Sequence, residues 1–169
     1  IDNRECSRYC CTSMVGQALR LRRLGKSVRV LFREMRTYTR HGEERYREAS
    51  EAGVAFFRYP DRNPEEVISY SNGELRFFDE TVHANVMMKT DLLVLMCGLV
   101  PGEENISKQL KVTHSEDGFL LEKHPKLGPV EAGSPGIFLV GTVQGPKDVR
   151  ESISPVSYTH LTLPTNREV

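Results

Sequence analysis

Three of the four cysteines in this chain lie within six residues, as Cys6, Cys10 and Cys11 in the segment Cys-Ser-Arg-Tyr-Cys-Cys. Thiolates are preferred ligands of zinc and of iron in iron–sulfur clusters. If the segment is helical, Cys6 and Cys10 stand one turn apart on the same face, with Cβ atoms about 5–6 Å apart. Cys10 and Cys11 do not close an ordinary disulfide, because neighbouring Cα atoms are held about 3.8 Å apart. The cluster predicts a metal site that lacks one ligand, and the alternative is a set of cysteines at a buried helix start.

A second candidate site lies at residues 136–148, where the apolar run Gly-Ile-Phe-Leu-Val-Gly precedes Thr-Val-Gln-Gly-Pro-Lys-Asp. We expect a buried strand that ends at Gly141, then a glycine turn, then a helix with Pro146 in its first turn. A strand, a glycine turn and a helix N-terminus together form an anion-binding geometry. The same turn joins many strands to helices without a ligand, so the residues alone leave both interpretations open.

The remaining polar residues indicate no reaction. Basic side chains crowd residues 20–40, but no interleaved aromatic residues suit base stacking. We therefore expect a solvated helix end and a polar loop there, with no nucleic-acid partner. The histidines are scattered, and the chain contains no Gly-x-Gly-x-x-Gly, P-loop, Gly-x-Ser-x-Gly or His-Glu-x-x-His motif. We assign no catalytic acid or base.

Composition limits the class of protein. The chain has 169 residues, no net formal charge and 38% hydrophobic residues, as expected for one soluble globular domain or two small ones. Its longest apolar run, residues 92–97, is far shorter than the roughly 20 residues of a membrane span. We therefore expect no direct membrane insertion. Clustered cysteines without a visible signal peptide favour a reducing cytoplasm.

An α/β layer must position the cysteine cluster. Apolar spacing predicts a helix over residues 12–23 that Gly25 ends, and β-forming residues predict a strand over residues 27–32. A charged helix over residues 43–52, closed by Gly53, precedes a strand over residues 54–59. Alternating helices and strands of this kind are typical of a parallel βαβ layer.

The middle of the chain predicts an antiparallel meander. Strands over residues 67–70 and 74–78 flank Asn72-Gly73, a preferred hairpin turn, and a third strand covers residues 84–88. The continuously apolar residues 92–97 predict a strand covered on both faces, which returns the chain to a main sheet. Downstream we expect a short strand over residues 118–121 and a proline-rich connector to residue 136.

The two ends of the chain carry a different expectation. Residues 155–169 resemble the translation of a sequencing adapter, so we exclude this non-native tail, His160 included, from functional arguments. The natural chain is then expected to end near Ser154, inside a helix. Because the sequence begins with Ile1 rather than Met, we also expect it to be truncated at its start.

Three segments together resemble one family, the iron–sulfur flavoprotein A subunit of heterodisulfide reductase. They are residues 6–11, residues 33–38 (Arg-Glu-Met-Arg-Thr-Tyr) and residues 124–148, and the likeness spans nearly all of residues 1–154. The resemblance implies a thioredoxin-reductase-like, Rossmann-type two-domain flavoprotein. Residues 1–97 would be a nucleotide-domain-like region that carries the cysteine motif. Residues 98–154 would be the C-terminal part of the FAD-binding domain.

The same resemblance implies two cofactor sites. Cys6, Cys10 and Cys11 would supply three ligands of a [4Fe–4S] cluster, with a fourth cysteine upstream of Ile1. FAD would contact the residues that follow the expected strand: Gly141, Thr142, Val143, Gln144, Gly145, Lys147 and Asp148. Many related reductases carry Asp where this chain has Thr142, so individual hydrogen bonds are not carried over. The loop that binds the FAD pyrophosphate would lie outside the fragment, which we expect to be inactive alone.

The function implied is that of an oxidoreductase, an electron-transfer subunit for flavin-based bifurcation. Its partners would be the other subunits of a heterodisulfide reductase-like complex and an electron donor protein. Two alternatives remain. One is a pyridine-nucleotide-dependent FAD disulfide oxidoreductase, weakened because residues 12–59 lack a nucleotide fingerprint. The other is a non-catalytic, zinc-stabilised interaction module.

Overall fold

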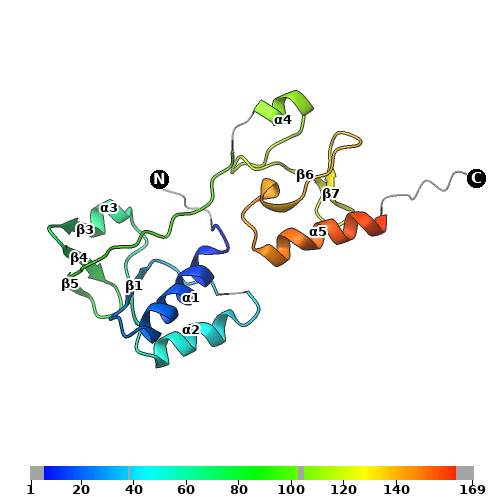
Figure 1. The fold of residues 1–169 in the computed structure, drawn as a ribbon. Helices are drawn as coiled ribbons and strands as arrows, with labels where there is room; N and C mark the ends of the chain where they lie inside the picture. The colour runs from blue at the N-terminus through cyan, green and yellow to red at the C-terminus, as the bar shows by residue number, and fades with distance from the viewer. Residues whose placement is uncertain (1–5, 38, 103–104, 163–169) are drawn as a thin grey trace, which may run out of the picture. The chain divides into compact units, whose positions relative to one another are not determined.

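The computed structural model describes residues 6–37, 39–102 and 105–162, without the side chains of residues 105 and 158–162. The described chain divides into two compact units (Figure 1). The first unit holds residues 10–97, and the second unit holds residues 6–9 together with residues from 98 onward. Both contain helices and strands, which confirms the α/β class. The assignment of residues 1–97 and 98–154 to two named domains stays a prediction.

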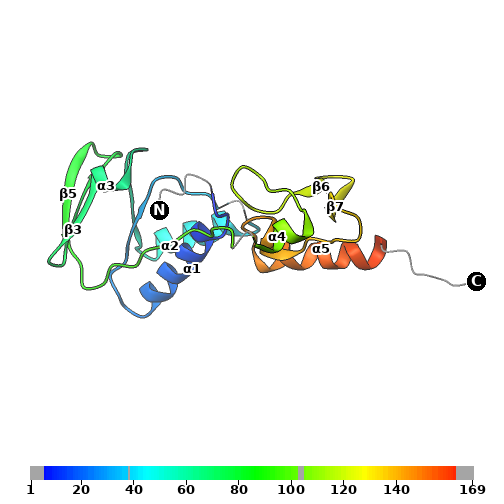
Figure 2. The ribbon, with the colours of Figure 1, turned by 90° about the horizontal axis from the view of Figure 1, so that it is seen from above.

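The first unit begins with the alternating layer that the sequence predicts. Its elements are α1 (Cys10–Arg23), β1 (Arg29–Phe32), α2 (Gly42–Glu51) and β2 (Ala55–Arg58). β1 and β2 pair in parallel, with Val30 opposite Phe56. Figures 1 and 2 show α1 and α2 side by side. The helices end where expected, because Gly25 and Gly53 have φ values of 77° and 89°, which favour glycine.

The core of this unit lies between the helices and the parallel strands. Its buried members come from α1, β1, α2 and the residue before β2: Val15, Ala18, Leu19, Val30, Ala49 and Val54. Successive side chains on β2 then point to opposite faces. Phe56 packs on Tyr46 of α2 with ring centroids 4.7 Å apart, and Phe57 contacts Phe77 of the meander at 5.4 Å.

The predicted antiparallel meander is confirmed. A short helix, α3 (Pro64–Val67), leads into β3 (Ile68–Ser71), β4 (Glu74–Asp79) and β5 (Ala84–Lys89), paired in that order. Asn72 and Gly73 both have positive φ, 50° and 75°, as a two-residue hairpin turn requires. Leu75 and Phe77 on β4 are buried.

The predicted strand at residues 92–97 is wrong. These residues form neither helix nor strand, and the side chains of Leu92 and Leu95 are each 74% exposed. A strand covered on both faces needs neighbouring strands. Among the residues that the structure describes, no strand pairs with this run.

The second unit contains fewer regular elements. They are α4 (Asn105–Leu110), β6 (Glu122–His124), β7 (Gly128–Ala132), a 3₁₀ turn η1 (Gly141–Gln144) and α5 (Val149–Thr162). β6 and β7 form an antiparallel hairpin where we expected a proline-rich connector. The turn is held by His124, whose Nδ1 accepts from the backbone N–H groups of Lys126 and Leu127, both at 3.1 Å. That side-chain cap is the feature the prediction missed.

The predicted strands at residues 118–121 and 136–141 are also wrong. Each is reduced to a single bridge, Leu120 with His114 and Phe138 with Glu131. Gly136 and Gly141 turn the backbone with φ values of 78° and 72°, so pairing along residues 136–141 stops after a few bonds. Leu139 is buried, whereas Phe138 is 41% exposed.

Helix α5 begins at Val149, so Pro146 does not stand in its first turn as expected. The helix continues through Pro155 to Thr162. The adapter-like origin of residues 155–169 stays a prediction. Within the described ranges, no helix combines the length and apolar character needed to cross a membrane.

Candidate functional site

The three clustered cysteines occupy two kinds of backbone. Cys10 and Cys11 are the first two residues of α1, and Cys6 lies in the segment before it. Between them, Arg8 adopts the left-handed conformation with φ of 58°, which a right-handed helix cannot contain. The condition for a one-turn relation of Cys6 and Cys10, a helix that contains both, is therefore not met. All three cysteines are half-buried.

Cys11 is held against the segment that follows β1. Its Sγ donates to the backbone oxygen of Glu34 at 3.8 Å. Next to it, the hydroxyls of Thr12 and Thr39 are 3.1 Å apart and share a hydrogen bond. The side chain of Glu34 accepts from Arg36 at 2.6 Å, and this hydrogen bond lowers the pKa of the Glu34 carboxyl. The start of α1 is thus fixed by long-range contacts within the first unit.

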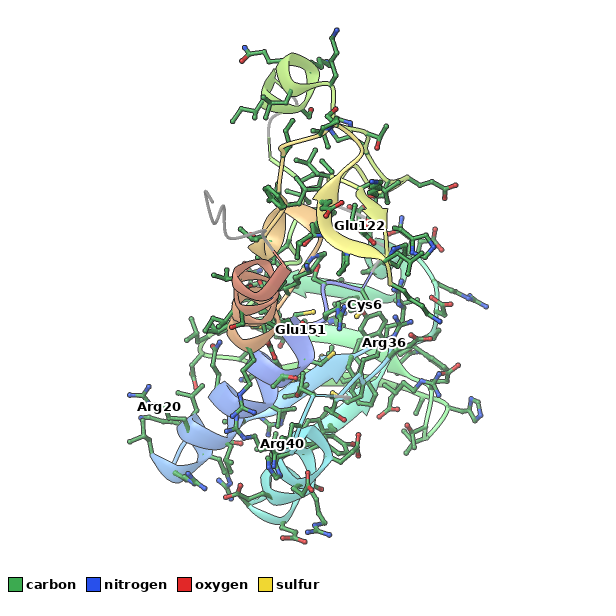
Figure 3. The ribbon with its side chains drawn as sticks, turned by 90° about the vertical axis from the view of Figure 1, so that its right-hand side faces the viewer. Cys6, Arg20, Arg36, Arg40, Glu122 and Glu151 are labelled. Atoms are coloured by element: carbon green, nitrogen blue, oxygen red, sulfur yellow. The ribbon has the colours of Figure 1, made fainter. Side chains whose placement is uncertain are left out.

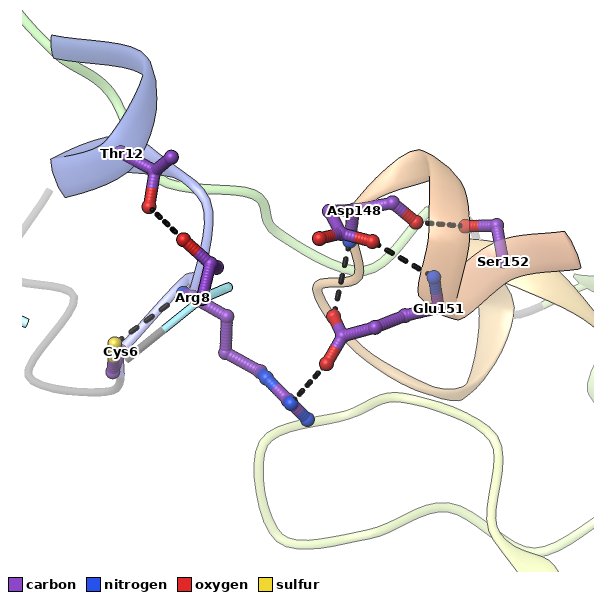
Figure 4. Close-up of polar contacts among 7 residues, drawn as sticks. Cys6, Arg8, Thr12, Asp148, Glu151 and Ser152 are labelled. Atoms are coloured by element: carbon purple, nitrogen blue, oxygen red, sulfur yellow. Dashed lines mark hydrogen bonds and ion pairs between the residues drawn. The ribbon is translucent and has the colours of Figure 1, made fainter. Parts of the chain in front are cut away.

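Cys6 is held within the second unit. Its Sγ accepts from the backbone N–H of Arg8 at 3.3 Å. Ser7 is buried, and its Oγ accepts from the backbone N–H of Leu99 at 2.8 Å. The Arg8 guanidinium forms an ion pair with Glu151 of α5, as Figure 4 shows. Sequence reasoning missed Glu151, which lies 143 positions from Arg8, and Ser7, which lies 92 positions from Leu99, since no local spacing links such residues.

The glycine turn at residues 141–148 is built from polar side chains. Gln144 Nε2 donates to the backbone oxygen of Pro129 at 2.8 Å, and Lys147 Nζ donates to Gln144 Oε1 at 2.8 Å. Partial burial lowers the pKa of Lys147. A Cβ added at Gly141 or Gly145 would meet no atom within 4 Å. Gly141 is half-buried and Gly145 is buried, so of these two glycines only Gly141 offers its backbone to a ligand.

The N-terminus of α5 is already capped by its own carboxylates. Asp148 Oδ1 accepts from the backbone N–H of Glu151 at 2.7 Å, and Glu151 Oε2 accepts from the backbone N–H of Asp148 at 3.1 Å (Figure 4). This reciprocal arrangement is a capping box. It places negative charge where we expected an anion to bind, so the helix end is poorly suited to a phosphate. The Asp-x-x-Glu spacing was the signal that would have predicted it.

The expected metal site has suitable donor atoms, but in the described part of the chain its side chains are not grouped around a common point. Three thiols fit the donor chemistry of an iron–sulfur cluster. Among the described residues, however, no three His, Cys, Asp or Glu side chains are grouped to hold a metal ion. The assignment of the cysteines as ligands therefore rests on their types and sequence spacing.

The basic stretch at residues 20–40 is largely balanced by other groups, as a solvated surface would be. Arg23 pairs with Glu48 of α2, and Arg33 Nε lies 3.5 Å from Asp61 Oδ1. Arg22 Nε donates to the backbone oxygen of Ala52 at 2.8 Å. Arg20 and Arg40, labelled in Figure 3, are exposed. These pairings favour a structural role for the stretch.

Comparison with known proteins finds relatives of one kind. No protein-family model matches the chain. The A subunit of ferredoxin:CoB-CoM heterodisulfide reductase from Methanosarcina acetivorans is 34% identical over 158 residues, which cover 90% of this chain and 19% of that protein. The iron-sulfur A subunit of CoB--CoM heterodisulfide reductase from Methanocaldococcus jannaschii is 34% identical over 154 residues, 88% of this chain and 23% of that protein. Over 88–90% of its length the chain is therefore similar to A subunits of heterodisulfide reductases.

A third relative agrees. The A subunit of H(2):CoB-CoM heterodisulfide,ferredoxin reductase from Methanothermobacter marburgensis is 33% identical over 159 residues, 90% of this chain and 24% of that protein. This confirms the resemblance to the heterodisulfide reductase A subunits. The chain spans about a fifth to a quarter of the length of these curated relatives. The relatives are subunits of oxidoreductases, which agrees with the expected reaction class.

Proposed function

We propose that this chain is part of an electron-transfer subunit of a heterodisulfide reductase-type complex, with FAD and a [4Fe–4S] cluster as cofactors. The observation that carries the proposal is the Cys-x₃-Cys-Cys motif, whose last two cysteines begin α1, in a chain whose M. jannaschii relative is named an iron-sulfur subunit. When bound, the flavin exchanges two electrons and the cluster exchanges one at a time.

The start of α1 suits negatively charged ligands. Cys10 and Cys11 occupy its first turn, and that turn contains no acidic residue. The N-terminus of a helix favours negative charge through the helix dipole. α5 differs, because its own carboxylates cap it. Of these two helix ends, only the first-unit end carries soft metal ligands.

We assign the glycine turn to the flavin but not to its pyrophosphate. The open space beside the half-buried Gly141 supports contact with a cofactor, and Thr142 and Val143 are exposed. The capping box argues against a phosphate at α5. The pyrophosphate would then be bound by another part of the subunit. This arrangement agrees with a thioredoxin-reductase-like architecture in which residues 98–154 belong to the FAD domain.

The wider proposal is a cytoplasmic subunit for flavin-based electron bifurcation. Its partners would be the other subunits of the complex and an electron donor. The names of two relatives include ferredoxin, which makes a ferredoxin-type protein the first donor or acceptor to test.

The cluster is tested by anaerobic reconstitution of the full-length subunit with iron and sulfide, followed by electron paramagnetic resonance. We expect an iron–sulfur signal that Cys10→Ser and Cys11→Ser abolish. Cys97→Ser is the matched control, since Cys97 is exposed and lies outside the motif, and it should retain the signal. Stoichiometric zinc without an iron–sulfur signal would contradict the proposal and support a zinc-stabilised module.

The flavin segment is tested separately by measuring FAD content. Thr142→Glu places a negative charge beside the glycine turn, and we expect it to lower bound FAD while the iron–sulfur signal remains. Leu127→Glu is the control, because Leu127 is 83% exposed in the β6–β7 turn. Equal FAD content in the two variants would remove residues 141–148 from the flavin site.

A further inference from the structure

The residues that follow Cys6 make contacts that a cysteine does not need in order to bind a metal. The backbone N–H of Arg8 points at its sulfur, with N and Sγ 3.3 Å apart. Arg8 adopts a left-handed conformation, φ 58°, that is unfavourable for a residue with a Cβ. A conformation of this kind persists when surrounding contacts impose it.

Two side-chain contacts, one made by Ser7 and one by Arg8 itself, hold the backbone in that conformation. Ser7 is 3% exposed, and its hydroxyl accepts from the backbone N–H of Leu99. The guanidinium of Arg8 pairs with Glu151, which is itself oriented by accepting from the backbone N–H of Asp148. Ser7, Arg8 and Glu151 are here called the Cys6 latch. Their bonds all lie within the second unit.

We propose that the Cys6 latch is a positioning device: Ser7 and Glu151 hold Arg8 so that its backbone N–H stays on the Cys6 sulfur. Hydrogen bonds to ligand sulfurs are among the factors that set the reduction potential of iron–sulfur clusters. Glu151 would thus tune a cluster that it does not ligate. The effect on a cluster rests on the proposed function, whereas the latch itself is a property of the chain without a metal.

Charge in this region extends beyond the ion pair. Glu122 and Glu151 both raise the pKa of Lys147, against the stronger lowering by burial, and Arg8 lowers it. Figure 3 labels Glu122 and Glu151 in this unit. Glu122→Gln therefore removes a carboxylate from the same charge cluster without removing the partner of Arg8, and it serves as a charge control.

The first measurement is hydrogen exchange in the metal-free, full-length subunit. Glu151→Gln keeps an oxygen for the Asp148 N–H but removes the charge that pairs with Arg8. We expect exchange of the Arg8 and Leu99 amides to accelerate about 2- to 5-fold, as for loss of a partly exposed ion pair. Ser7→Ala should accelerate it about tenfold, because it leaves the Leu99 N–H without its acceptor. Arg8→Lys, which keeps the cation, should stay within about twofold of the unmodified chain.

Two controls frame these results. Glu48→Gln breaks the Arg23 ion pair on α1 and α2, in the first unit, and should leave the Arg8 and Leu99 amides unchanged. Glu122→Gln should do the same. The proposal is overturned if the Arg8 and Leu99 amides exchange no faster in Glu151→Gln and Ser7→Ala than in the controls.

The second measurement is the midpoint potential of the iron–sulfur signal in the reconstituted protein. Glu151→Gln and Ser7→Ala should shift this midpoint potential while the signal is retained. Arg8→Lys, which keeps the cation, should have the potential of the unmodified chain. Faster amide exchange without a shift in the midpoint potential would show that the Cys6 latch only stabilises the local structure, and it would overturn the positioning role. Absence of a signal in the unmodified protein overturns the proposed function and this role together, and exchange still decides whether the latch exists.

Discussion

The first unit has more regular backbone pairing than the second unit, which uses side chains to complete several turns. In the first unit, three helices, a parallel strand pair and a three-stranded meander supply regular hydrogen bonds. In the second unit, backbone groups of Leu99, Pro129 and Lys126 are paired by the side chains of Ser7, Gln144 and His124. Backbone groups that lack a strand or helix partner must find another one.

The difference predicts where each unit is sensitive to substitution. Apolar burial should dominate the first unit, because its cluster of buried residues joins α1, β1 and α2. Polar substitutions should matter more in the second unit, where a single side chain often completes a turn. Matched pairs of substitutions compare the two kinds of sensitivity.

The largest expected effect is loss of core volume in the first unit. Leu19→Ala on α1 removes a side chain that is 7% exposed. We expect a loss of about 2–5 kcal/mol in the free energy of unfolding, from lost burial and a residual cavity. Leu21→Ala is the control on the same helix, since Leu21 is 39% exposed, and it should cost much less. Hydrogen exchange of the α1 and β1 amides measures both, and equal costs would contradict a core-dominated unit.

Two glycines of the first unit should respond to alanine with opposite signs. A Cβ at Gly42, the first residue of α2, would overlap the Thr37 carbonyl, with 2.8 Å to its carbon. We expect Gly42→Ala to destabilise the unit by about 1–3 kcal/mol through strain. A Cβ at Gly16, inside α1, meets nothing within 4 Å. Gly16→Ala should therefore stabilise it by about 0.5–1 kcal/mol through helix propensity.

Urea unfolding of the two alanine variants distinguishes the local geometry from a general effect of alanine. A stabilised Gly42→Ala variant would show that the Thr37 carbonyl moves away freely. A destabilised Gly16→Ala variant would contradict the expectation that glycine at position 16 lowers the stability of α1.

The same contrast explains how much of the fold was predictable. Residues 12–59 and 67–88 have the spacing of amphipathic helices, β-forming runs and a clear hairpin turn, and each predicted element there is present. Residues 92–97, 118–121 and 136–141 are apolar runs without that context. An apolar run indicates burial only if a partner covers it, and the sequence does not say whether one does. The β6–β7 hairpin depends on the side chain of His124.

The candidate site shows the same limit. Residue type and spacing were enough to single out Cys6, Cys10, Cys11 and the glycine turn. The backbone conformation of Arg8 and its pairing with Glu151 depend on chain segments that are distant in sequence. The capping box at Asp148 was predictable from local spacing and was missed.

A polar substitution in the second unit should cost more than a matched one in the first. Gln144→Leu removes the donor to the Pro129 carbonyl, a part-buried bond. We expect a cost of about 1–2 kcal/mol, from a carbonyl left without its donor. Gln17→Leu is the control, because Gln17 donates to Ser13 on the exposed face of α1; its cost should be about 0.5 kcal/mol or less. Urea unfolding with hydrogen exchange in each unit compares them, and equal costs would contradict the role of side chains in the second unit.

The smallest expected effect is a pH dependence that comes from Lys147. Burial lowers the pKa of Lys147 from its ordinary value of 10.5 in the folded chain. Below the folded pKa both states are protonated, and the folded state carries the full cost of burying the charge. As the pH rises from the folded pKa to 10.5, the folded chain loses its proton first, so the unfolded chain binds more protons and stability rises. The free energy of unfolding of the unmodified chain, minus that of Lys147→Met, should therefore increase across this window.

Lys26→Met removes an exposed lysine of the first unit and corrects for the general loss of one charge. If this difference in the free energy of unfolding falls with rising pH, Glu122 and Glu151 stabilise the Lys147 ammonium more than burial destabilises it. The charged groups around Lys147 would then stabilise the second unit.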